Sequence, residues 1–135
     1  MEELSRGLLD TSVLIAREED SRVEQALPQE IAISVATLAE LHYGVLIAKD
    51  EEKRQQRLRR LGVVEATFHP VPIDAAIARA FATLAQVVRT IGRQPRARVM
   101  DLWIAATALA LETPLYTRNP DDFSGLESLI DVRVV

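Results

Sequence analysis

The chain has 135 residues, a formal net charge of −4, 48% hydrophobic residues, 27% charged residues and no cysteine. This length predicts one domain, over residues 1–135, that can bury a sizeable core. The lack of cysteine excludes a disulfide scaffold and thiolate metal sites and fits a reducing compartment, so we expect a cytoplasmic protein. No apolar run is long enough to span a membrane. The acidic start does not indicate a signal peptide, and two histidines are too few for a histidine-rich zinc site.

Basic residues are concentrated in two stretches of this acidic chain. Residues 49–60 contain six basic side chains against three acids, and residues 89–98 contain four arginines and no acid. A solvated helix face and a basic loop explain either cluster taken alone. Two such clusters also suggest a track for a phosphate backbone, although the net charge argues against coating of nucleic acid by bulk charge.

Short strand-like segments alternate with helical ones along the chain. Strands are predicted over residues 7–10, 31–34, 115–117 and 131–135, and residues 67–72 are β-like. Helices are predicted over residues 11–16, 21–27, 35–48, 50–61 (ended by Gly62), 75–91 and 100–112. This alternation predicts an α/β fold in which a small parallel β-sheet is flanked by helices. In such sheets ligands bind beyond the carboxyl ends of the strands, where Asp10 and residues 117–119 are expected.

The stretch Val99–Leu111 is almost wholly apolar and contains a single acid, Asp101. A helix this apolar is expected to be buried nearly all round. An ionised aspartate at the start of such a helix costs roughly several kcal/mol unless it is compensated. The helix's own N–H groups, a cation, or both could compensate it. We expect Asp101 to be one of several carboxylates that meet around a metal ion.

Acidic and amide side chains recur at three other places in apolar or tight settings. Asp10 closes a strand, Glu40 lies in the middle of an apolar helix, and the turn after residues 115–117 contains Asn119, Asp121 and Asp122. Helix capping explains Asp10, and ordinary turn chemistry explains the turn residues. Glu40 is harder to explain in this way, because the pattern of its helix predicts little exposed surface.

Converging carboxylates of this kind suit a hard divalent cation. Without a cation they raise one another's pKa. Mg²⁺ takes oxygen ligands, keeps several waters and usually binds one or two carboxylates plus a substrate phosphate. A bound metal lowers the pKa of water and holds a phosphoryl oxygen, which suits phosphodiester hydrolysis. Thr11, Ser12 and Thr117 could orient the ligand carboxylates or the waters.

Competing chemistries lack their parts. The sequence contains no phosphate-binding P-loop, no dinucleotide-binding glycine pattern, no G-x-S-x-G elbow and no cysteine nucleophile. His42 lies roughly 200° around the helix axis from Glu40, so it is expected outside the site. Trp103 is expected in the core.

Four motifs span nearly the whole chain: Leu9–Ile15, Thr37–Gly44, Asp101–Ala108 and Tyr116–Phe123. Together they resemble the PIN-domain family and, within it, the VapC-like toxins of bacterial type II toxin–antitoxin pairs. They occur in that family's order and spacing.

This resemblance implies a small parallel sheet flanked by helices, ribonuclease activity that depends on Mg²⁺ or Mn²⁺, and usually a homodimer. It also implies inhibition by a cognate antitoxin whose tail enters the acidic site. Carried over by motif, Asp10, Glu40 and Asp101 are the three core acids. Asn119 occupies the fourth family position, which is often aspartate. Asp121 or Asp122 could substitute there, or could only shape the turn or bind a neighbouring arginine.

We therefore predict a metal-dependent endoribonuclease with Asp10, Glu40, Asp101 and Asn119 as catalytic residues. The metal is held by Asp10, Asp101 and Glu40, and a second ion is expected only with substrate. The residues predicted to bind RNA are Arg93, Arg96 and Arg98. A catalytically silent PIN-like module that binds RNA or a protein is the alternative, which the three core acids disfavour. A DNA-directed nuclease of related fold is less favoured, because the chain has no spare length for the usual insertions.

Overall fold

Four short parallel strands form the centre of the computed structural model, which describes residues 5–135. The strands are β1 (Arg6–Leu9), β2 (Glu30–Ala32), β3 (Leu115–Thr117) and β4 (Val132–Val134). Their order across the sheet is β2-β1-β3-β4, and every neighbouring pair is parallel. Strands β1 and β3, far apart in the chain, therefore end at the same edge of the sheet.

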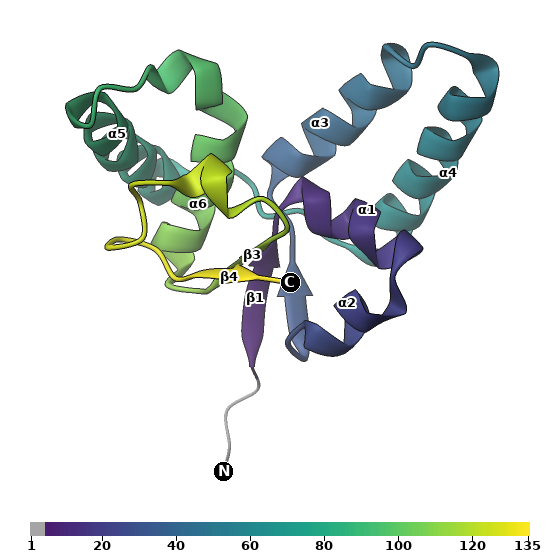
Figure 1. The fold of residues 1–135 in the computed structure, drawn as a ribbon, viewed down its shortest axis with the longest axis horizontal. Coiled ribbons are helices and arrows are strands. Elements are labelled where there is room, and N and C mark those ends of the chain that lie inside the picture. The colour runs from purple at the N-terminus through teal and green to yellow at the C-terminus, as the bar shows by residue number, and fades with distance from the viewer. Residues whose placement is uncertain (1–4) are drawn as a thin grey trace.

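Helices cover both faces of this sheet (Figure 1). The α-helices are α1 (Thr11–Glu19), α2 (Ser21–Ala26), α3 (Val35–Leu46), α4 (Glu51–Thr67), α5 (Ala75–Thr90) and α6 (Val99–Leu111). Two short 3₁₀ helices are η1 (Pro95–Arg98) and η2 (Pro120–Phe123). Helices α5 and α6 lie on one side of the sheet and α1 to α4 on the other (Figure 1). The predicted α/β fold is confirmed.

The core is divided in two by the alternation of side chains along the strands. Leu8 and Leu115 are paired neighbours that face the α5–α6 side, whereas Leu9 and Tyr116 are paired neighbours that face the α1–α4 side. Successive strand residues point to opposite faces, so β1 and β3 each contribute to the apolar clusters on both sides of the sheet. Phe123 is also fully buried, which anchors η2 beside the carboxyl edge of the sheet.

Gly7 allows the ring of Tyr116, in the apolar cluster on the α1–α4 side, to pack directly against β1. A Cβ at this position would lie 2.5 Å from Cε2 of Tyr116 and 2.9 Å from Cγ of Pro28. Both distances are too short for real contacts, so only glycine lets the tyrosine ring cross the strand here.

The predicted end of helix α4 was wrong. The helix was expected to end at Gly62 but continues to Thr67. Leu61 and Val64 are both buried, and Phe68 extends the same apolar row just past the end of the helix. Burial of this row outweighs the cost of about 1 kcal/mol that a glycine carries within a helix.

The segment after α4 is not a strand. Residues 67–72, expected to be β-like, form only one isolated bridge, from Val71 to Ser34. Two prolines in this segment have no N–H to donate to a ladder, which limits pairing.

The second half of α3 is also more exposed than its pattern predicts. Tyr43 is 62% exposed, Leu46 82% and Ile47 54%. Helix α3 projects beyond the sheet together with α4, so the sheet covers only its first half (Figure 1). In the part of the chain that the structure describes, no helix combines the length and the apolarity that crossing a membrane requires.

Candidate metal centre

The candidate site lies at the carboxyl edge of the sheet, where β1 and β3 end and α1 begins. Asp10 follows β1 directly and is the N-cap of α1, because its Oδ1 accepts the N–H of Val13 at 3.3 Å. The residue is only 4% exposed. Burial raises the pKa of the Asp10 carboxyl, and its hydrogen bonds act in the opposite direction.

Two hydroxyl groups hold the Asp10 carboxylate in place. Ser12 Oγ donates to Oδ1 at 2.5 Å, and Thr117 Oγ1 donates to Oδ2 at 2.6 Å. Each hydroxyl oxygen in turn accepts a backbone N–H from the segment after β3: Arg118 N–H bonds to Ser12 at 3.1 Å and Asn119 N–H bonds to Thr117 at 2.9 Å. The end of β3 therefore orients a carboxylate at the end of β1, as outer partners do for metal ligands.

Glu40 approaches the same place from α3. Its Oε1 accepts the hydroxyl of Thr11, in the first turn of α1, at 2.7 Å. Burial raises the pKa of Glu40, the bond from Thr11 lowers it, and the negative charges of Asp10 and Asp122 raise it further.

Asp101 lies in the first turn of α6 and is not its cap. The N-cap position is Arg98, which makes no side-chain cap hydrogen bond. Burial raises the pKa of Asp101 to about 6, with further contributions from the charges of Asp122, Glu40 and Asp10. The charge of Arg98 acts in the opposite direction.

The turn after β3 brings one more acid to the site. Asp122 is partly buried, and its negative charge raises the pKa of both Glu40 and Asp101. Asp121 and Asn119 are exposed. The carbonyl groups of Asn119 and Asp121 accept the N–H groups of Asp122 and Ser124, at 3.1 and 3.2 Å, which shapes η2.

Arg98 is the residue that reasoning from the sequence placed differently. It was grouped with Arg93 and Arg96 as a contact for RNA. In the structure its Nη1 donates to Oδ1 of Asp122 at 3.2 Å, so it neutralises part of the acidic site. Its spacing of three residues from Asp101, across the start of one helix, was the available signal. Arg93 and Arg96 are exposed.

His42 was expected outside the site and Trp103 in the core. His42 is exposed and pairs with Glu65, Nε2 to Oε1 at 3.2 Å. Trp103 is partly buried, packs against the core and stacks on Phe81 with ring centroids 4.0 Å apart.

The donor chemistry of the site fits a hard divalent cation. The negative charges of Asp10 and Asp122 raise the pKa of both Glu40 and Asp101, and a nearby cation would reverse that effect. Among residues 5–135, however, no three His, Cys, Asp or Glu side chains are placed to hold one ion jointly. Mg²⁺ commonly binds one or two carboxylates directly and reaches others through water, so this spacing suits a hydrated ion.

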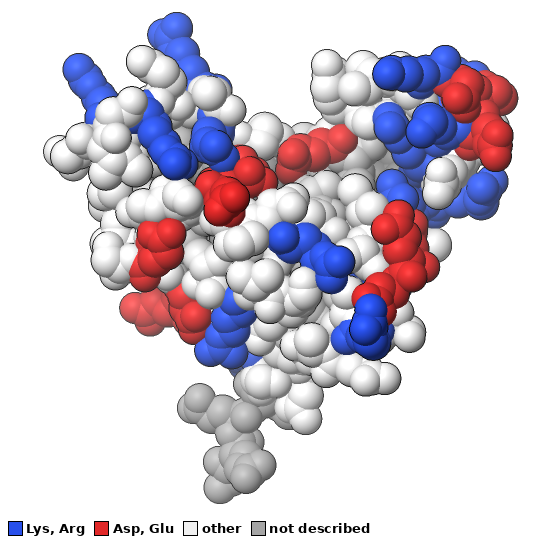
Figure 2. Space-filling view, in the orientation of Figure 1, with Lys and Arg blue, Asp and Glu red and all other residues white. Residues whose placement is uncertain are grey.

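The acids lie between two basic projections of the molecule. Figure 2 shows a notch with acidic side chains at its base and basic side chains on both flanks, and the flank at the upper right also carries acidic side chains. One flank, here called the η1 arm, carries Arg89, Arg93 and Arg96. The other, the α4 arm, carries Lys49, Lys53, Arg54 and Arg57. An anionic chain crossing the notch would meet positive charge on either side of the acids.

Known proteins share this fold and sequence pattern. Residues 7–127 match the model of the PIN domain. The chain is 42% identical to ribonuclease VapC5 of Mycobacterium tuberculosis over 130 residues, which are 96% of this chain and 93% of that protein. It is 32% identical to ribonuclease VapC of Rickettsia bellii over 128 residues, 90% of this chain and 91% of the relative.

A solved structure agrees with these relatives. The crystal structure of VapBC-5, a member of the VapBC family of toxin–antitoxin systems from M. tuberculosis, matches with a TM-score of 0.80 and 39% identity. The match covers 97% of this chain and 98% of that one. The chain therefore belongs to the PIN-domain family and, within it, to the VapC ribonucleases.

Proposed function

We propose that this protein is an endoribonuclease that depends on Mg²⁺ or Mn²⁺ and acts as the toxin of a type II toxin–antitoxin pair in the cytoplasm. The observation that carries the proposal is the meeting of Asp10, Glu40 and Asp101, from three separate elements, in a setting that raises the pKa of each. Shifted pKa values of this kind cluster at functional sites. Membership of the VapC ribonucleases supports RNA as the substrate.

The acids of the chain divide the work of hydrolysis. Asp10 and Asp101 would hold the metal, and Glu40 would bind the ion or its water. A bound divalent ion lowers the pKa of a water molecule and offsets the charge of a phosphodiester. Thr117 and Ser12 keep the Asp10 oxygens aimed, and Thr11 does the same for Glu40.

We assign the fourth acidic position to Asp122 rather than to Asn119 or Asp121. Asp122 is the turn residue whose charge acts on Glu40 and Asp101. Arg98 offsets it, so the site carries four acids and one cation before metal binds. A net charge near −3 suits one tightly held divalent ion, with a second ion only when phosphate arrives. Asn119 offers a carbonyl oxygen without charge and contributes less.

A cleavage assay with metal titration tests the site. The purified protein is expected to cut a labelled RNA pool with Mg²⁺ or Mn²⁺ and to stop when EDTA is added. Calorimetry is expected to show one tight site in the wild type, weakened in Asp122→Asn and little changed in Asn119→Ala. Asp121→Asn is the matched control in the same turn. RNA binding without cleavage under every metal condition would favour the silent binding module instead.

An antitoxin protein is the proposed partner, and its tail is proposed to enter the acidic site. The VapBC-5 structure belongs to a toxin–antitoxin family, which supports a cognate partner for this chain. A homodimer is proposed as the working form. Size-exclusion chromatography with light scattering, alone and with the product of a neighbouring short reading frame, measures both associations.

The η1 arm is proposed to bind RNA phosphates. Arg93 and Arg96 are exposed and able to contact a backbone, whereas Arg98 is already bonded to Asp122. Replacing Arg93 and Arg96 with glutamine should weaken RNA binding and flatten its salt dependence. Arg98→Gln should in addition change metal affinity, because it removes the counter-charge of the fourth acid.

A further inference from the structure

A cleft leads away from the acidic site along the inner side of the α4 arm. Its volume is about 820 Å³, within the usual range of small-molecule sites. Thr11, Glu40 and Met100 line it near the acids, and α4 forms the far wall. The cleft therefore begins where the scissile phosphate is proposed to lie and continues for some distance beyond it.

The two walls of this cleft have different chemistry. The walls made by α1 and α3 present mainly apolar side chains, among them Ile15, Leu41 and Ile47, and the 62% exposed Tyr43 also lines the cleft. The exposed carboxylate of Glu19, at the end of α1, is the acidic group of these walls away from the acidic site. The α4 wall presents cationic and amide groups. The α4 residues that line the cleft are Lys53, Gln56, Arg57 and Arg60.

Two of these cations are available for a ligand. Arg60 is held by Glu18 through two bonds of 2.9 Å, so its charge is already balanced. Arg57 donates to the carbonyl oxygen of Gly44 at 2.7 Å. Within residues 5–135, neither Arg57 nor Lys53 forms an ion pair with a carboxylate. An occupant of this cleft is thus expected to be anionic along α4 and flat or apolar along α3.

A single RNA strand has this combination of properties, because its bases stack on apolar and aromatic surfaces while its phosphates bind lysine and arginine. We propose that the cleft between α1, α3 and α4 is a nucleotide subsite that binds the RNA immediately on one side of the scissile phosphate, with its bases against α3 and its phosphates on Lys53 and Arg57. This inference rests on the proposed ribonuclease function.

The opposite side of the notch differs in kind. The η1 arm offers the exposed side chains of Arg93 and Arg96, and neither residue lines the cleft. Phosphate contacts carry no sequence information by themselves, whereas enclosed bases can be distinguished. The enzyme should therefore discriminate nucleotides on one side of the cut and tolerate any sequence on the other.

Gly44 provides a way to fill the cleft without touching the acids. It lines the cleft, and a Cβ added there would lie 4.0 Å from Cδ of Arg57, an ordinary contact distance. A larger side chain at this position would occupy the space between α3 and α4. Gly62 is the matched control, because it is also a helical glycine, and a Cβ there meets nothing within 4 Å.

The test measures RNA binding in EDTA, using a fluorescein-labelled single-stranded RNA 12-mer of random sequence. Gly44→Val and Arg57→Gln are expected to weaken binding about tenfold. Gly62→Val and Arg59→Gln, the control on the same helix, are expected to bind as the wild type does. Arg57→Gln should also reduce the salt slope by about 0.7, the value for one phosphate of a single strand. If Gly44→Val fails to fold, Gly44→Gln fills the same space with a better helix former.

Sequencing the ends produced from a randomised RNA pool provides the second arm. The wild type should show base preference on one side of the cut, and Gly44→Val should lose it. Unchanged RNA binding in both cleft variants would overturn the proposal, and so would loss of antitoxin binding alone, which would make the cleft a peptide site. Absence of cleavage in every protein would refute the proposed function, yet the binding arm in EDTA would still decide the role of the cleft.

Discussion

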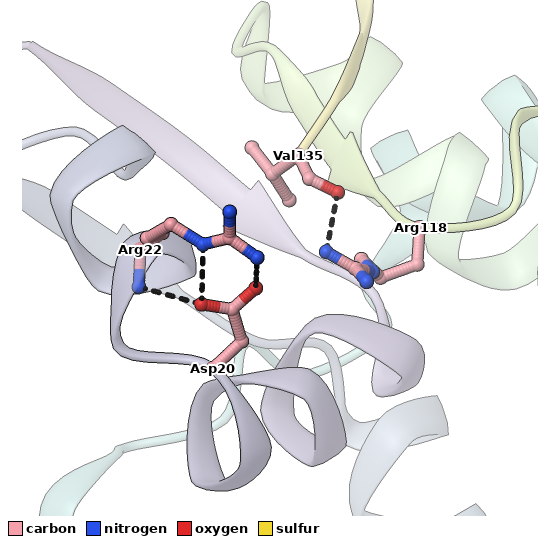
Figure 3. A network of polar contacts seen from close by, with 4 residues as sticks. All are labelled: Asp20, Arg22, Arg118 and Val135. Carbon is pink, nitrogen blue, oxygen red and sulfur yellow. Dashed lines mark hydrogen bonds and ion pairs between the residues drawn. The ribbon is translucent and has the colours of Figure 1, made fainter.

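Asp10 and Asp20 cap successive helices, yet their surroundings are opposite in kind. Asp20 caps α2 and accepts three bonds from Arg22: its N–H at 2.9 Å, Nε at 3.1 Å and Nη2 at 3.0 Å (Figure 3). These bonds lower the pKa of Asp20, and the charge of Arg118 lowers it a little further. Asp10 caps α1 and is held by neutral hydroxyls, and its pKa is raised.

The difference separates a carboxylate with a structural role from one that we propose to bind a metal. Capping alone is common to both residues, so it decides nothing. The arginine beside Asp20 completes its electrostatics within the chain, whereas hydroxyls orient Asp10 without neutralising it. A buried carboxylate that the chain orients but leaves without a cation is prepared for a cation from outside.

The largest expected effect is on catalysis by Asp101→Asn. Asparagine keeps the shape of the side chain but removes the charge that a metal needs. RNA cleavage should fall by more than the roughly 100-fold that loss of an outer partner of a metal ligand can cost. Asp20→Asn, the control, should cut at the wild-type rate. Wild-type cleavage by Asp101→Asn, measured on labelled RNA with Mg²⁺, would reduce Asp101 to a structural role.

Removal of one hydroxyl should produce the next largest effect. Thr117→Val keeps the shape of a fully buried side chain but deletes the 2.6 Å bond to Asp10. Metal affinity, measured by calorimetry, should fall about 10- to 100-fold. Thr107→Val is matched in burial and bonds only to the Trp103 carbonyl, so it should leave metal affinity unchanged. Equal losses in both variants would point to general damage to the core.

Metal should stabilise the native protein through Asp10 and not through Asp20. Binding to the folded state alone adds about 2.7 kcal/mol at a hundredfold excess over Kd. The melting temperature should rise by at least about 5 °C in saturating Mg²⁺ or Mn²⁺. Asp10→Asn should shrink this rise, and Asp20→Asn should retain it. A melting temperature that does not move with metal would argue against a preformed site.

The pH dependence of stability should have opposite signs at the two kinds of acid. The folded-state pKa of Asp101 is about 6, above its ordinary value of 3.8. Its contribution to stability is therefore present below pH 3.8 and is lost as pH rises through 6. The lowered pKa of Asp20 contributes stability above pH 3.8 that is lost as pH falls.

Urea unfolding without metal, from pH 3.5 to 7.5, measures this smaller effect. Relative to Asp101→Asn, the wild type should become less stable between about pH 4 and pH 6. Relative to Asp20→Asn, its added stability should be constant above about pH 5 and should begin to fall as the pH drops toward 3.5. If the free energies of unfolding of the wild type and Asp101→Asn differ by the same amount over the whole range, the pKa of Asp101 is not raised in the folded protein.

The sequence by itself determined the order of elements and which acids to suspect. Alternating short apolar runs and 3.6-residue periodicity are local signals, and they placed β1, α1, α3, α5 and α6 to within a few residues. Asp10 and Asp101 were recognisable because each is an acid at the boundary of a buried element. Parallel strands have ligands at their carboxyl ends, so the edge of the sheet that holds Asp10 also followed from the pattern.

Only the tertiary structure decided which hydrogen-bond and ion-pair partners these acids have. The bond from Thr117 to Asp10 exists because β1 and β3 are neighbours in the sheet, and no local pattern encodes that order. The pairing of Arg98 with Asp122 joins the start of α6 to η2 in the same way. The extension of α4 past Gly62 and the exposure of the second half of α3 depend on which side chains find partners in the core. Local sequence specifies periodicity and capping, whereas burial and charge balance are properties of residues brought together from distant parts of the chain.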